Sequence, residues 1–160
     1  MDLYLYRWGP DNGWNEIRLT TSDDITQCAL ALSPTGHQVA LCSDGTNVLA
    51  AADAQLGEGA TMGTLISAAD SPACAFGLNG RLHIAYRATA AQRLKYDYSD
   101  DQGATVTGSP VTVTATAYAD PVGLGLTQDH FGRLVLVVGN GTNLVTHRST
   151  DDGETWSEVS

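Results

Sequence analysis

Large and small apolar residues alternate along three short segments of the chain, which is typical of β-strands with one crowded face. These segments are Cys28–Ser33, Cys74–Asn79 and Val122–Thr127. After a turn, each segment is followed by a nearly continuous apolar run, at residues 36–42, 80–86 and 132–138. Such runs are expected of strands that are covered on both faces. The pattern predicts three copies of one β-sheet unit.

Each unit continues into a third strand, predicted at residues 48–52, 94–98 and 144–148. In two units the preceding turn contains Asp44-Gly45 or Asn140-Gly141, and such dipeptides between apolar runs favour tight hairpins. A fourth strand is expected to follow, beginning near the threonine of the polar motif described next. Four antiparallel strands would then recur every 45 to 50 residues or so, a period typical of propeller blades.

A polar motif recurs after the third strand. Ser99–Val106 and Ser149–Trp156 both read Ser-x-Asp-x-Gly-x-Thr followed by an apolar residue, and degraded copies lie at Asp11 and near Gly59. The chain therefore divides into a half unit and three whole units. The predicted boundaries are 1–20, 21–66, 67–114 and 115–160 within one all-β domain.

The motif resembles that of the Asp-box (bacterial neuraminidase repeat) family of β-propellers. The resemblance implies that the box is a turn whose aspartate accepts backbone hydrogen bonds, and that Trp156 lies between blades. It also implies that the box is scaffold, away from the catalytic face. The residues assigned to it are Asp11, Ser99, Asp101, Gly103, Thr105, Ser149, Asp151, Gly153, Thr155 and Trp156.

Enzymes of that family use an arginine triad, a Tyr/Glu nucleophile pair and an acidic general acid/base. This chain lacks the family's Arg-Ile-Pro signature, and Glu58 and Glu154 lie beside box turns. A retaining glycosidase needs paired catalytic groups about 5 Å apart, and no convincing pair can be nominated. We predict that the chain is not an enzyme, and a sialidase-like glycoside hydrolase or its remnant is the alternative.

Three aspartates recur just before the first strands and are candidates for ligand binding. Asp24, Asp70 and Asp120 fall in loops that would gather near a propeller axis, where ligands usually bind by analogy with other propellers. Arg87, Arg93 and Tyr118 are expected in neighbouring loops, with Tyr118 as a stacking platform for a sugar. The simpler interpretation, which we prefer, is that each aspartate caps a turn.

Cysteines and histidines give no metal site by their spacing. In the repeat, Cys28 and Cys74 align with Val122, and Cys42 aligns with Tyr86, so all three are expected to be small core residues. His83 aligns with Val39 and Val135 and is expected to be an interior histidine. No metal and no cofactor are predicted.

Charge and hydropathy exclude several partners. The net charge is −10 and the eight Lys and Arg residues are scattered, so nucleic acid and anionic membrane surfaces are not expected to bind. No apolar run approaches the roughly 20 residues of a membrane span, and residues 1–4 lack the pattern of a signal peptide. Either the protein is made in the cytoplasm, or a leader lies outside this sequence.

Three and a half blades would leave unpaired strand edges and open faces at both ends of the chain. Either the chain is part of a longer propeller, or other copies of the chain or a larger assembly cover these edges, with a glycan as a further expected ligand. The predicted function is a non-catalytic binding or structural module for assembly or adhesion. A bacteriophage virion, as a tail, fibre or decoration component, is the predicted setting.

Overall fold

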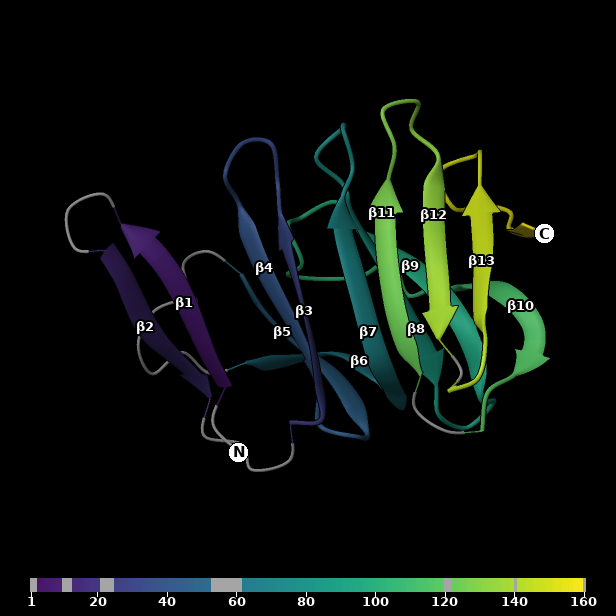
Figure 1. The fold of residues 1–160 in the computed structure, drawn as a ribbon, viewed down its shortest axis with the longest axis horizontal. Coiled ribbons are helices and arrows are strands. Elements are labelled where there is room, and N and C mark those ends of the chain that lie inside the picture. The colour runs from purple at the N-terminus through teal and green to yellow at the C-terminus, as the bar shows by residue number, and fades with distance from the viewer. Residues whose placement is uncertain are drawn as a thin grey trace.

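The computed structural model describes residues 3–9, 13–20, 25–52, 62–119, 122–139 and 141–159, and in these residues all regular structure is β-strand (Figure 1). A two-stranded hairpin contains β1 (Leu3–Gly9) and β2 (Gly13–Thr20). Three four-stranded antiparallel sheets follow, so the predicted all-β repeat is confirmed. None of the described residues form a helix that is long and apolar enough to span a membrane.

Each four-stranded sheet is a meander whose strands pair in chain order. The first sheet contains β3 (Gln27–Leu32), β4 (Gln38–Ser43), β5 (Asn47–Ala52) and β6 (Gly63–Ser67). The second contains β7 (Ala69–Phe76), β8 (Leu82–Ala88), β9 (Arg93–Ser99) and β10 (Val111–Ala117). The third contains β11 (Gly123–Gln128), β12 (Leu134–Gly139), β13 (Leu144–Ser149) and β14 (Ser157–Val159).

The first strands of the three sheets lie next to one another, with β7 between β3 and β11 (Figure 1). The sheets therefore face each other in chain order. Between the first and second sheets lie fully buried side chains such as Leu41 and Ile84. Between the second and third lie Tyr96, Leu134 and Leu136. Burial of apolar faces between consecutive sheets is what holds the molecule together.

The turn after each first strand has the same hydrogen bonds in all three sheets. Ser33 N donates to His37 O at 2.7 Å, Gly77 N to Arg81 O at 2.8 Å, and Asp129 N to Arg133 O at 2.9 Å. This common register corrects the sequence alignment of the first strands. Cys74 lies three residues before its turn and Cys28 five residues before, so the two cysteines are not equivalent.

The fourth strand of the second sheet begins later than the sequence pattern predicts. β10 begins at Val111, well after the box residue Thr105, whereas β14 begins at Ser157, shortly after Thr155. The intervening segment is held against β9, because Thr107 N donates to Tyr98 O at 3.2 Å and Thr107 Oγ1 donates to Asp97 Oδ1.

Candidate functional site

The two complete copies of the repeated motif form nearly identical turns. In the first, Ser99 Oγ accepts a hydrogen bond from Gly103 N at 2.8 Å, and Asp101 Oδ1 accepts one from Thr105 N at 2.8 Å. Asp101 Oδ2 also accepts a bond from Thr105 Oγ1 at 2.6 Å. Hydroxyl and backbone donors favour the charged carboxylate, and they lower the pKa of Asp101 to about 2.

The second copy repeats this geometry at the end of β13. Gly153 N donates to Ser149 Oγ at 2.9 Å, and Thr155 N donates to Asp151 Oδ1 at 2.9 Å. Both turns contain two successive residues with positive φ, which are Gln102 and Gly103 in the first and Asp152 and Gly153 in the second. The carboxylates are thus occupied within their own turns.

The glycine of each box turn also packs against the preceding sheet. A Cβ on Gly103 would lie 3.2 Å from Val39 Cγ1 of the first sheet, and a Cβ on Gly153 would lie 2.1 Å from Tyr96 Cε1 of the second. Trp156 packs against the same Tyr96 ring, with 5.5 Å between the ring centroids and an angle of 55° between the ring planes. The turns therefore belong to the interfaces between sheets, which sequence reasoning identified only for Trp156.

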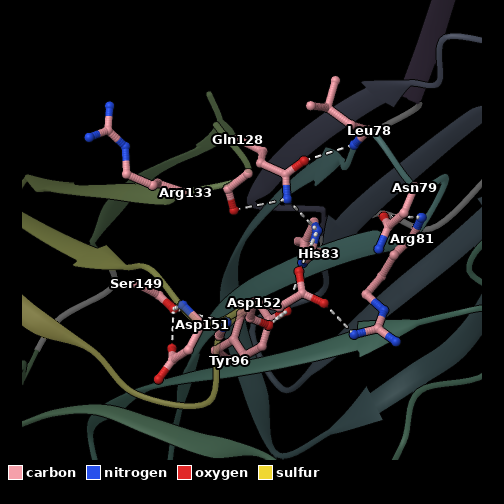
Figure 2. Close-up of polar contacts among 12 residues, drawn as sticks. Leu78, Asn79, Arg81, His83, Tyr96, Gln128, Arg133, Ser149, Asp151 and Asp152 are labelled. Atoms are coloured by element: carbon pink, nitrogen blue, oxygen red, sulfur yellow. Dashed lines mark hydrogen bonds and ion pairs between the residues drawn. The ribbon is translucent and has the colours of Figure 1, made fainter. Parts of the chain in front are cut away.

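Arg81, just before β8, connects both box turns, and Figure 2 shows its contact with Asp152 of the second turn. Its Nε donates to Asp100 Oδ1 at 2.8 Å, and its Nη1 donates to Asp152 Oδ2 at 2.6 Å in the third sheet. Arg133, which occupies the equivalent place in the repeat, instead bonds its own turn through Asp129 Oδ2 at 2.6 Å. The repeated Gly-Arg pair in the sequence does not reveal this difference.

His83 is fully buried beside the same network, as the repeat predicts (Figure 2). The Tyr96 hydroxyl lies 2.7 Å from His83 Nδ1 and donates to Asp152 O at 3.1 Å. Burial lowers the pKa of His83 to about 4, so the ring is neutral at pH 7. The neutral imidazole is enclosed in this network, where its two ring nitrogens lie within hydrogen-bond distance of Tyr96 and Gln128.

A hollow of about 100 Å³ lies beside this network, lined by Arg81, Tyr98, Asp152 and Glu154 among others. Pockets that enclose small organic ligands are typically several times larger, about 300 Å³ or more. The hollow is therefore too small to enclose a sugar.

Asp70 and Arg87, two of the predicted ligand-binding residues, form a buried ion pair. They are strand residues of β7 and β8, which corrects their assignment to loops, and they are only 3% and 5% exposed. Arg87 Nε donates to Asp70 Oδ1 at 2.8 Å, and Nη2 binds Asp70 Oδ2. Arg87 Nη1 donates to the carbonyl oxygens of Tyr118 and Ala119 at 2.9 and 3.0 Å. The guanidinium thus ties the segment after β10 to the second sheet.

Tyr118 lies beside this ion pair but is 7% exposed and belongs to the core between the second and third sheets. Its position corrects its predicted role as a stacking platform, because a buried ring cannot stack on a ligand in solvent. Arg93 is exposed at the start of β9. Asp11, Asp24 and Asp120 lie outside the described residues.

Ser71 was not singled out in the sequence, yet it joins the second and third sheets. A register shift in β7 gives Ser71 a φ of 53°, and its Oγ donates to Asp70 Oδ1 at 3.0 Å. The same oxygen accepts a bond from Val122 N at 3.1 Å, and Val122 O accepts one from Gln27 Nε2 at 3.1 Å. Only the bulge creates this contact, so strand periodicity gives no signal for it.

The cysteines depart from the prediction in part. Cys42 and Cys74 are buried, but Cys28 is exposed on β3. Among the described residues there is no cluster of three or more His, Cys, Asp or Glu side chains suited to a metal ion.

An exposed row of first-strand residues remains at each end of the array of sheets, although Ala40, Cys42 and Ala51 on the outward face of β4 and β5 are buried. On β3, the row that points away from the second sheet contains Cys28, Leu30 and Leu32, and the two leucines are 56% and 64% exposed. On the third sheet, the row of β11 that points away from the second sheet contains Gly123, Gly125 and Thr127, all exposed. We call these the leucine face and the glycine face.

The size of the first-strand side chains differs between the side that faces the next sheet and the side that faces the preceding sheet. Toward the next sheet, β3 presents Ala29 and Ala31. In the same way, β7 presents Ala73 and Ala75 toward the third sheet, because their pairing partners on β8 face that sheet. Toward the preceding sheet, β7 presents Cys74 and Phe76, and β11 presents Leu124 and Leu126. Small side chains thus meet larger ones at each interface. The leucine face carries the larger half of such a pair, and the glycine face carries the smaller half.

No family model matches the sequence, and no curated protein matches it. Solved structures do match in fold. A GH43 β-1,3-galactosidase with galactodeoxynojirimycin has a TM-score of 0.66 at 8% identity, over 92% of this chain and 64% of that chain. YCF48 bound to D1 peptide has a TM-score of 0.62 at 21% identity, over 97% and 46% of the two chains. A Hadza microbial sialidase has a TM-score of 0.62 at 14% identity, over 99% and 40%.

The chain therefore spans less than two thirds of each of these neighbours. The TM-scores of 0.62 and 0.66 show a common fold, the β-propeller, and at 21% and 8% identity they show the fold alone. The four-stranded sheets are its blades, and the predicted fold class is confirmed.

Proposed function

We propose that this chain is a non-catalytic binding or structural module built as a propeller segment. Copies of the chain assemble, and the leucine face of one copy packs against the glycine face of another. The observation that carries the proposal is the match between the two open faces and the buried interfaces. Leu30 has the register position of Cys74 in β7 and Leu126 in β11. Leu32 has the position of Phe76 and Gln128, and all four of these residues face the preceding blade. Gly125 stands at the register position of Ala29 and Ala73.

The expected assembly is a closed dimer. Each chain supplies three four-stranded blades and the β1–β2 hairpin. Propellers usually have about four to eight blades, so two copies fall within that range and three copies exceed it. A head-to-tail interface forms a ring when the rotation closes and a filament when it does not. The ring would cover both open faces.

A glycosidase is the second candidate, because a galactosidase and a sialidase are among the structures with this fold. The contacts of the described residues support glycosidase activity less well than assembly. Asp70 and Arg87 neutralise each other in a buried pair, and the box carboxylates bind their own turns. Glycan binding, adhesion and a virion setting are further parts of the proposal, and a glycan array tests the first of them.

Association is tested by charged substitution on the leucine face, measured by sedimentation velocity. Leu32→Lys should weaken dimerisation at least tenfold, because burying a leucine contributes about 1.5 to 3 kcal/mol and a buried lysine would be unpaired. Leu78→Lys is the matched control. Leu78 is 67% exposed in the turn between β7 and β8, outside both faces, and its substitution should leave the dimer intact.

A second variant tests the opposite face. A Cβ on Gly125 meets no atom within 4 Å in the chain, so Gly125→Val is expected to fold and to block only the packing of a partner. If both face variants sediment like the unmodified chain, the proposed interface is wrong. If they dissociate the dimer while Leu78→Lys does not, it is supported.

A further inference from the structure

Cys28 and Cys42 form a pair of facing thiols on the first sheet. They are register partners across β3 and β4, and their Sγ atoms lie 3.0 Å apart with Cys42 as the hydrogen-bond donor. Cys28 is exposed and Cys42 is fully buried. One sulfur therefore meets solvent while the other lies directly behind it.

The hairpin places this pair where a disulfide fits. Ser33 N donates to His37 O, and hydrogen-bonded pairs alternate along an antiparallel ladder. Five positions further along, Cys28 and Cys42 therefore form a non-hydrogen-bonded pair. The Cα atoms of such pairs are about 4.5 Å apart, within the range of about 4.4 to 6.8 Å that disulfides require.

We propose that Cys28 and Cys42 are an oxidisable dithiol that closes to an intrachain disulfide by exchange with a low-molecular-weight disulfide. The Cys28 thiolate attacks one sulfur of the small disulfide, forms a mixed disulfide and releases one small thiol. The Cys42 thiolate then attacks Cys28 Sγ, forms the Cys28–Cys42 bond and releases the second small thiol. Two protein thiols are oxidised, one small disulfide is reduced, and the two protons end on the released thiols.

The surroundings assign these two roles. The hydrogen bond from Cys42 lowers the pKa of Cys28, which favours the thiolate at the exposed position. The hydrogen bond to Cys28 and burial raise the pKa of Cys42, so Cys42 keeps its proton while Cys28 is a thiolate. It touches Cys28 and is shielded from solvent, so it is placed for the second attack once Cys28 has reacted. Cys74 lies in the separate core between the first and second sheets, where burial raises its pKa to about 12. It is expected to stay reduced.

The experiment incubates the folded chain with oxidised glutathione and measures intact mass and free thiols. The thiol count is expected to fall from three to one, with a mass loss of about 2 Da and reversal by a dithiol reductant. Cys42→Ser should stop at the mixed disulfide and gain one glutathione, because the resolving thiol is missing. Cys28→Ser should neither close nor gain glutathione, and Cys74→Ser should close like the unmodified chain.

Two results for the unmodified chain would overturn the proposal. The chain would accumulate the mixed disulfide without closing, or would form disulfides between chains on a non-reducing gel. Circular dichroism of each variant, compared with the unmodified chain, verifies that the substitutions leave the sheets folded. Cys28 belongs to the leucine face, which the proposed dimer would cover, so the exchange takes place on the free chain. The same incubation is therefore run on Leu32→Lys, which leaves the leucine face open. Closure in Leu32→Lys supports the proposal whether or not the unmodified chain dimerises, and an unchanged thiol count in Leu32→Lys overturns it.

Discussion

Gly153 combines two constraints at one residue. Its φ of 96° is a conformation that glycine adopts without strain, and the space where a Cβ would lie is occupied by the Tyr96 ring. Gly141 has a similar φ of 88°, but a Cβ there meets no atom within 4 Å. Comparing substitutions at these two glycines therefore distinguishes the cost of backbone strain from the cost of crowding between blades.

Gly153→Ala should therefore cost more stability than Gly141→Ala. We expect about 1 to 2 kcal/mol for the backbone strain in Gly141→Ala, and a further 1 to 3 kcal/mol or so for overpacking in Gly153→Ala. Urea denaturation of both variants measures the difference. Equal losses in the two variants would contradict the assignment of Gly153 to the interface.

His83 makes stability depend on pH in a predictable direction. Its pKa is about 4 in the folded chain and near 6.5 when unfolded, so the unfolded chain binds the proton more tightly. The stabilisation is complete above pH 6.5 and is lost as the pH falls toward 4. Burial also lowers the pKa of His147, which adds in the same direction.

His83→Val should reduce this loss of stability on acidification, since Val39 and Val135 fill the equivalent positions of the other blades. Urea denaturation at pH 7.5 and at pH 5 is expected to give a smaller difference for His83→Val than for the unmodified chain. An identical difference would mean that His83 is not buried in its neutral form.

At the scale of elements, strand periodicity and the turn motifs predicted the repeated four-stranded sheets. Details that depend on contacts between strands were missed. The equivalence of Cys28 and Cys74 was wrong, because their turns begin at different distances from them. The late start of β10 depends on Thr107 binding β9, and neither feature is encoded by alternation of apolar residues.

The candidate ligand site shows the same limit. The sequence placed Asp70, Arg87 and Tyr118 in one region, and the structure brings all three together. Residue types alone did not reveal that the carboxylate and guanidinium neutralise each other, or that the tyrosine is buried. The bulge at Ser71 and the burial between blades determine both outcomes.

Breaking the Asp70–Arg87 pair should destabilise the fold strongly. Arg87→Met leaves the buried Asp70 carboxylate unpaired and frees the Tyr118 and Ala119 carbonyls, for an expected loss of about 3 to 5 kcal/mol. Arg93→Met, at an exposed position, is the control and should change stability by no more than about 0.5 kcal/mol. Denaturation midpoints that are the same for both variants would contradict the structural role of Arg87.

At the scale of the whole molecule, the open faces and the charge act in opposite directions. Apolar burial between copies favours association, whereas a net charge of −10 on each chain opposes it. Added salt screens that repulsion, so it should strengthen the dimer. A contact driven by ion pairs would weaken instead.

The molar mass of the unmodified chain in solution tests the central claim most directly. Light scattering coupled to size-exclusion chromatography, over a range of concentrations, should give a discrete species at twice the 16.8 kDa of one chain. A mass of 16.8 kDa at every concentration, or a ladder of growing oligomers, would contradict the closed dimer.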